Sequence, residues 1–345
     1  MEKKDLCLEI VTKYNNFVKI EEAWRLEYEK ALQKNKNAIR VAHSGMKDVC
    51  ESFERVENLI CCGYEKAKEL MEEDFYGTEE FEMTVGFKTN VKIPKIEYTA
   101  AHLQEAKEHG EMLVLRIGQD NEGNPMTMKR ILEIMAPRMP EGERLLYKQL
   151  HPGSAVIQSD SWYKDEPFFT QDSLKTEWVL IGKEFAPNTI NNNLAHQTLE
   201  LYNEMKRRGL LTKEEEKENI GLEKRLKELC EKMGVNWESQ HVDNQEKCGK
   251  NRPEVSRELA NLSINRKHRR SPVGILYDWA MRFKSRKGER GVLSGLMYDW
   301  SNTVTDPGSF VGLCDLNSDG GDVYRMRLDR IDISGAILFR GLPDR

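Results

Sequence analysis

Apolar residues recur at helical spacing through the first 75 residues, for example at Val18, Tyr28, Val49 and Phe53. This spacing is that of an amphipathic helix. Gly45 follows a polar pair and interrupts the pattern. The sequence therefore predicts a helical hairpin over residues 1–75, and its helices are where we expect any self-association of the chain.

Residues 76–233 combine strand and helix periods and predict a mixed α/β unit. Alternating apolar residues favour a short β-hairpin from Phe81–Val85 and Val91–Ile93. Further strands are expected at 112–117, 145–147 and 178–181. Helices are expected over about 99–109, 126–135, 192–208 and 213–233, and Thr212 with Glu215 forms a capping-box pattern at the start of the last one.

Residues 234–270 begin with a polar stretch that has no hydrophobic period, which predicts a linker. The segment ends in the basic cluster Arg266–Arg270. Adjacent cations of this kind either hold phosphate groups or mark a solvated helix boundary. The absence of interleaved stacking aromatics argues against a nucleic-acid platform.

The composition changes near the end of the chain, because none of the 30 Lys and 41 Glu residues follows Arg290. Lys and Glu favour helices, so their loss together with many glycines indicates turns and strands. We expect a final domain over residues 271–345, with one helix at Val273–Phe283 and a small antiparallel β unit. Its apolar segments are Val292–Leu293, Phe310–Leu313 and Ala336–Phe339. The whole chain is therefore expected to be an α+β protein.

Overall composition narrows the function classes. The 345 residues carry a formal net charge of −5, which argues against a protein that coats nucleic acid. No apolar run is long enough for a membrane span, and no apolar core follows the start as in a secretory signal. Seven unevenly spaced cysteines do not form a disulfide pattern, so we expect reduced thiols and a cytoplasmic location.

Residues 315–334 are dense in Asp, Arg, Asn and Tyr, and many of these alternate with apolar residues such as Val323, Met326 and Leu328. A face of Tyr, Asn, Asp and Arg is typical of an adaptable contact surface, because Tyr supplies rigid area and the others supply directional bonds. The alternative is an ordinary charged hairpin surface.

The tail also resembles a known family. The resemblance rests on short motifs, with looser similarity around Trp178–Leu180 and Gln197–Thr198, and the motifs are Arg270–Val273, Leu276–Trp279, Tyr298–Ser301, Val311–Asp315, Gly321–Val323 and Ile333–Arg340. Together they resemble the C-terminal part of target proteins of diversity-generating retroelements. Those proteins end in a C-type-lectin-like domain of short antiparallel strands, in the variant related to formylglycine-generating enzymes.

The resemblance implies a non-catalytic protein that binds a protein or surface ligand through a displayed, hypervariable face. In that family, mutagenic reverse transcription acts at adenines, and the changed codons encode Asp, Ser, Tyr, Asn, Gly or Arg but not Lys, Glu, Gln or Trp. The tail has this composition if Met326 is a fixed position. Carried over by position, the implied ligand-binding residues are Asp315, Asn317, Asp319, Asp322, Tyr324, Arg325, Arg327, Asp329 and Asp332.

Other chemistries remain as alternatives. Asp315, Asn317 and Asp319 match the opening of a calcium loop, but Met326 stands where that loop needs a bidentate Glu. We therefore expect no cofactor, with calcium as the exception to test. Cys61–Cys62 and the set Cys230, His241 and Cys248 lack the paired spacing of zinc sites.

Two further classes remain: an intracellular assembly protein whose N-terminal helices self-associate and whose tail is scaffold, and an enzyme. No nucleophile, P-loop or dinucleotide signature occurs. The aromatic and acidic loop from Trp162 to Phe169 would have to form its pocket, with Asp160 or Asp165 as a perturbed carboxylate. The same aromatics would otherwise anchor a long loop on the body of the protein.

Overall fold

The computed structural model describes most of the chain beyond residue 61. The described residues are 12, 13, 16, 18–23, 25, 26, 62–139, 144–151, 153–190, 192–241, 243–285, 298–306, 308–315, 321–326 and 334–340. The chain forms two compact units, one of residues 1–62 with 98–102 and one of residues 63–97 with 103–345. The predicted hairpin over residues 1–75 lies mostly outside the described residues.

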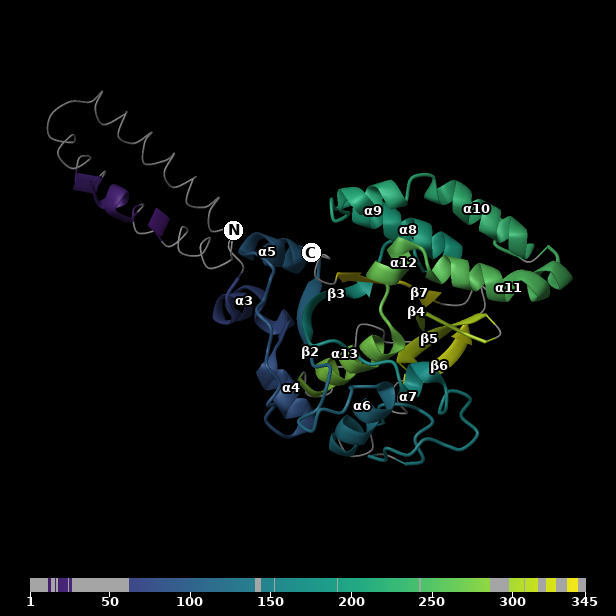
Figure 1. Ribbon diagram of the computed structural model, residues 1–345, viewed down its shortest axis with the longest axis horizontal. Helices are drawn as coiled ribbons and strands as arrows, with labels where there is room; N and C mark the ends of the chain where they lie inside the picture. The colour runs from purple at the N-terminus through teal and green to yellow at the C-terminus, as the bar shows by residue number, and fades with distance from the viewer. Residues whose placement is uncertain are drawn as a thin grey trace, which may run out of the picture. The chain divides into compact units, whose positions relative to one another are not determined.

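The second unit contains two four-stranded sheets (Figure 1). The first has the order β1-β2-β3-β8 and is built from β1 (Phe75–Tyr76), β2 (Glu111–Arg116), β3 (Glu177–Phe185) and β8 (Ile337–Arg340). Every residue of β2 is buried, which confirms the strand predicted from its continuous apolar run. Because β8 pairs antiparallel with β3, the last part of the chain completes the sheet of the middle segment.

The other sheet has the order β6-β5-β4-β7 and is built from β4 (Tyr298–Thr305), β5 (Ser309–Asp315), β6 (Gly321–Met326) and β7 (Ser334–Gly335). The pairs β4–β5 and β5–β6 are antiparallel, and β7 is parallel to β4. The small β unit predicted for the tail therefore exists, and the protein belongs to the α+β class.

The α13 helix (Pro272–Ser285) lies between the two sheets and confirms the helix predicted after the basic cluster (Figure 1). The Tyr277 hydroxyl donates to the Leu115 carbonyl at the end of β2, at 3.0 Å, and accepts from the Ile117 amide at 3.2 Å. A buried chain of ion pairs then crosses from one sheet to the other. Arg116 on β2 contacts Asp278 on α13 at 2.7 Å, and Arg270 contacts both Asp278 at 3.0 Å and Asp299 on β4 at 2.6 Å.

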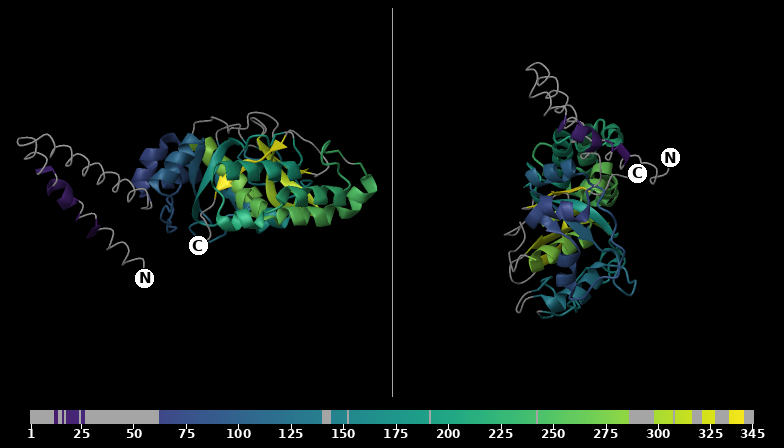
Figure 2. Two further views of the ribbon diagram at one scale, coloured as in Figure 1. Left: turned by 90° about the horizontal axis from the view of Figure 1, so that it is seen from above. Right: turned by 90° about the vertical axis from the view of Figure 1, so that its left-hand side faces the viewer.

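A layer of helices packs against the second sheet and shares one apolar core with it. Its members are α8 (Leu194–Arg207), α10 (Leu222–Met233), α11 (Gln245–Ala260) and α12 (Ser263–His268), and the short polar helix α9 (Lys213–Glu218) packs on α12. The α8, α10 and α11 helices lie side by side (Figure 2). The Thr212 hydroxyl accepts from the Glu215 amide at 3.2 Å and the Glu215 carboxylate accepts from the Thr212 amide at 2.8 Å, which confirms the capping box.

The remaining helices belong to the segment before β3. They are α3 (Tyr64–Met71), η1 (Glu72–Asp74), α4 (Thr78–Val85), α5 (Ala100–Glu108), α6 (Met128–Met135), η2 (Ala136–Arg138) and α7 (Pro167–Thr170). None of the helices in the described residues is both long enough and apolar enough to cross a membrane.

Three local predictions were wrong. Residues 81–85 belong to helix α4 and not to a β-hairpin, because the buried residues Phe81, Thr84 and Val85 follow helical spacing and Met83 points to solvent. Residues 145–147 form no strand, and the nearby Gln149 makes an isolated bridge with Ile157.

The predicted linker over residues 234–270 is also wrong, because α11 and α12 occupy most of it. Three widely spaced residues of α11, namely Cys248, Val255 and Leu259, are buried in the helical core. They lie on one face of α11, while the rest of the helix is polar and hides the period.

Candidate functional site

The face predicted for recognition begins at β6, which is an edge strand of its sheet. Val323 and Met326 are buried at 2% exposure each, so they fix the strand to the core. Between them, Tyr324 is 43% exposed and Arg325 is also exposed. The strand thus presents two adjacent polar side chains to solvent from a backbone paired with β5.

The loop from Trp162 to Phe169 packs directly against this edge. The Trp162 indole N–H donates to the Val323 carbonyl at 3.1 Å, so it covers a backbone acceptor of the edge strand. The Arg325 guanidinium carbon lies 4.3 Å from the Trp162 ring centroid, a cation–π contact worth about 0.5–1 kcal/mol at an exposed site. Arg325 Nη2 also lies 3.3 Å from Glu166 Oε1. Two side chains from the loop and one from the strand therefore hold one another in place.

The loop is held by its own aromatic cluster. Tyr163, Phe168 and Phe169 are buried, and the Tyr163 and Phe169 ring centroids lie 5.3 Å apart. Trp162 packs on both Tyr163 and Phe168 with ring centroids 5.7 Å away. The interpretation of these residues as anchors of a long loop is therefore confirmed, and Trp162 additionally reaches the recognition face.

Asp322 lies half-buried at the start of the same strand. Its Oδ1 accepts from the Val323 amide at 2.8 Å. Burial raises the pKa of the Asp322 carboxyl, while the Val323 amide and the charge of Lys148 oppose that increase. Burial also raises the pKa of the Tyr163 hydroxyl, with a further contribution from the Asp322 charge. Asp322 is therefore part of the junction between strand and loop.

Of the six other predicted contact residues, the structure describes only Asp315. Asp315 is the last residue of β5 and pairs in register with Gly321. Five further positions lie outside the described residues, namely Asn317, Asp319, Arg327, Asp329 and Asp332. The structure thus brings together Asp322, Tyr324 and Arg325.

The structure also bears on the metal sites and on the enzyme cleft considered as alternatives. The described residues contain no cluster of three or more His, Cys, Asp or Glu side chains that could hold a metal ion. Within that part of the chain Cys230 and Cys248 are both buried, and burial raises the pKa of the Cys230 thiol to about 12. Asp160 and Asp165, expected to line a cleft if the loop served an enzyme, are both exposed.

The basic cluster needs a correction, because neither a solvated boundary nor a phosphate site describes its C-terminal half. Arg269 and Arg270 are 2% and 3% exposed. Arg270 belongs to the ion chain between the sheets, and Arg269 donates to Asn265 at 2.7 Å and to Gln197 at 3.3 Å. The carboxylate partners of Arg270 lie 8 and 29 residues further along the chain, which composition alone does not reveal.

Sequence reasoning did not include Trp162 and Glu166 among the contact residues. Their signal was present in the aromatic and acidic composition of the loop, but nothing in the sequence connects that loop to a strand 161 residues later. Comparison of the chain with protein-family models, curated proteins and solved structures finds no match.

Proposed function

We propose that this protein is a non-catalytic ligand-binding protein whose recognition face is the edge strand β6 with the adjoining Trp162–Phe169 loop. The observation that carries the proposal is that β6 has buried residues that fix it to the core and exposed residues between them. Val323 and Met326 are buried and hold the strand, whereas Tyr324 and Arg325 between them are exposed. Exposed Tyr and Arg are the residue types most often found at the centre of protein interfaces.

The arrangement of Arg325 supports the same proposal. Trp162 and Glu166 hold the guanidinium by one face and one nitrogen. Among the described residues it has no other ion partner, so its remaining N–H groups can donate to a ligand. A side chain held in this way loses less entropy on binding than a freely rotating one.

We further propose that the tail is a C-type-lectin-like domain diversified by a retroelement. Support comes from the motifs of the tail, from the absence of Lys and Glu after Arg290, and from the antiparallel arrangement of β4, β5 and β6. In such a protein the scaffold is constant and the exposed polar positions vary.

A double variant tests the recognition face. Tyr324→Ala with Arg325→Ala should abolish capture of the ligand by immobilised protein, whereas stability should fall by no more than the Arg325–Trp162 contact contributes, about 0.5–1 kcal/mol. The matched control is Met83→Ala with Arg257→Ala, since these side chains are also well exposed, at 55% and 61%. Equal capture by both double variants, or loss of the fold in the first alone, contradicts the proposal.

Sequencing the gene neighbourhood tests diversification separately. The proposal expects a reverse transcriptase gene and a near-copy of the DNA that encodes residues 315–334, with differences mainly at adenines. Related genes should vary at Tyr324 and Arg325 and keep Val323 and Met326. Random variation across buried and exposed positions would count against diversification and would leave the binding test unaffected.

A further inference from the structure

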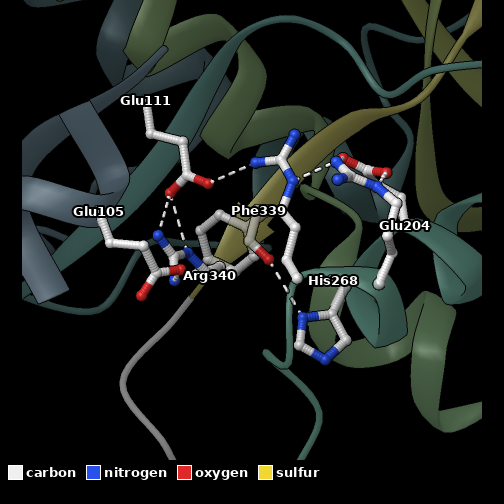
Figure 3. A network of polar contacts seen from close by, with 8 residues as sticks. Glu105, Glu111, Glu204, His268, Phe339 and Arg340 are labelled. Carbon is white, nitrogen blue, oxygen red and sulfur yellow. Dashed lines mark hydrogen bonds and ion pairs between the residues drawn. The ribbon is translucent and has the colours of Figure 1, made fainter. Parts of the chain in front are cut away.

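His268 lies at the end of α12 and is buried between α9 and β8. The residue is 8% exposed. Its Nδ1 lies 3.2 Å from the Phe339 carbonyl oxygen, a contact drawn in Figure 3, and its Nε2 lies 3.1 Å from Glu215 Oε1. These three residues, His268, Glu215 and Phe339, are called the His268 junction below.

The partners of the ring decide which protonation state fits. A backbone carbonyl can only accept, and an ionised carboxylate can only accept. Glu215 is ionised, because its pKa is lowered to about 2, chiefly by the hydrogen bond from His268. A neutral imidazole carries one N–H and satisfies one of these acceptors, whereas an imidazolium carries two and satisfies both.

The other charged groups near the ring are ion-paired, and one of them, Lys267, pairs with Glu215 itself. On α12 itself, Lys267 Nζ lies 3.6 Å from the same Glu215 oxygen. On β8, Arg340 contacts Glu111 of β2 at 2.6 Å. On α8, Glu204 contacts Arg208 at 2.5 Å (Figure 3).

The α11 helix, which also packs on α12, supplies no hydrogen bond or ion pair to the ring among the described residues. Glu215 is therefore the carboxylate in hydrogen-bond contact with His268.

The segment held by this junction connects the two sheets. Ser334–Gly335 is strand β7 and pairs with β4, and Ile337–Arg340 is strand β8 and pairs with β3, with Ala336 between them. Ala336 accepts from the Ala186 amide at 2.7 Å, and the Ile337 amide lies 3.4 Å from Asp299 Oδ1. Loosening of β8 therefore acts on both sheets.

We propose that the His268 junction is a proton-dependent latch on the C-terminal strand. The imidazolium ties β8 to α9 and α12. When the pH rises and the ring loses one proton, it can donate to only one of the two acceptors, so either Phe339 or Glu215 loses its hydrogen bond from His268 and β8 opens more often. The latch weakens as pH rises, the opposite direction from loss of a carboxylate ion pair on acidification. This inference does not depend on the proposed function.

Two measurements on the full chain test the latch. The first is ¹⁵N NMR of histidine-labelled protein, with the His268 signals identified by their absence in His268→Gln. We expect both ring nitrogens of His268 to be protonated at low pH. The second is hydrogen exchange of the amides in residues 337–340 between about pH 5 and pH 9, corrected for the intrinsic exchange rate. Opening of β8 should be about tenfold more frequent at the high end of this pH range than at the low end, the effect of one charge-assisted hydrogen bond.

Three variants make the test specific. His268→Gln should open β8 more often at low pH and lose the pH dependence. Glu215→Gln keeps a capping-box side chain, but without the negative charge it should move the transition to lower pH. His241→Gln changes an exposed histidine and should behave as wild type.

The proposal is overturned if His268 carries a single ring proton throughout this range. It is equally overturned if opening of β8 has the same pH dependence in His268→Gln as in wild type, or if Glu215→Gln does not move the transition. Should His268→Gln not fold, the wild-type spectra and Glu215→Gln still decide the question.

Discussion

Removal of Arg270 should destabilise the protein far more than removal of an exposed arginine. Arg270 is the only hydrogen-bonded cation of Asp299 in the described residues, at 2.6 Å, and it also contacts Asp278 at 3.0 Å. All three side chains are buried. Arg270→Met therefore leaves Asp299 as an uncompensated buried charge, and breaking a buried pair in this way costs about 3–5 kcal/mol. Asp278 keeps Arg116, so the larger part of the cost comes from Asp299.

The pH dependence of this loss follows from the Asp299 pKa. Burial raises that pKa and Arg270 lowers it. Without Arg270 the pKa of the Asp299 carboxyl group is raised further in the folded state. The folded protein then binds a proton at a pH where the unfolded chain does not. Stability then falls as pH rises above the unfolded value, and the deficit of Arg270→Met should be larger at about pH 7.5 than at about pH 5.

Urea unfolding followed by circular dichroism measures the effect. The control is Arg257→Met, because Arg257 and Asp306 form an exposed pair at 3.4 Å and such pairs contribute about 0–1 kcal/mol. Adding Asp299→Asn to Arg270→Met should recover part of the loss, since both charges are then absent. The reasoning is refuted if Arg270→Met unfolds at the same urea concentration as Arg257→Met, or if the double variant is less stable than the single one.

Three further outcomes are expected. Trp162→Ala removes the indole that fixes the loop to β6, so trypsin should cleave faster after Lys164 of the loop. Mass spectrometry follows the cleavage, and an unchanged rate would contradict the docking of the loop. Tyr324→Ser should change stability by no more than about 0.5 kcal/mol in urea unfolding, whereas Val323→Ser, at a buried position, should lower it by about 1–3 kcal/mol, and equal effects would deny the division between buried and exposed positions. Glu204 has a pKa lowered to about 2, chiefly by the hydrogen bond from Arg207. Its contribution is present above the unfolded value and is lost as pH falls toward 2, so the stability difference between wild type and Glu204→Gln should shrink over that interval, and a constant difference would argue against it.

Sequence patterns predicted those parts of the fold that depend on local contacts. The Thr212–Glu215 capping box, the buried strand β2 and the helix α13 are each determined by a few neighbouring residues. The prediction failed where the local signal was short or diluted. Phe81 and Val85 fit both a strand and a helix, and α11 buries few of its 16 residues.

Parts of the site that depend on distant contacts could not be predicted in the same way. Alternation of polar and apolar residues was enough to expect Val323 inside and Tyr324 outside, as the structure has them. The contact of Trp162 with β6 joins residues 161 positions apart, and the partners of Arg270 come from a helix and a strand that follow it. A run of basic residues is normally solvated, so only the folded arrangement shows that Arg270 is a buried link.

The way β6 is held bears on whether its surface can vary. On one side its backbone is paired with β5, and on the other side the Val323 carbonyl accepts from the Trp162 indole. These contacts use the backbone of β6 and the buried side chains Val323 and Met326, and they do not require a particular residue at position 324. Behind the strand, the ion chain through Arg270 links β4 to the first sheet. A strand fixed in this way can change its exposed residue at position 324 while keeping its position, which is the physical condition that a diversified recognition face has to meet.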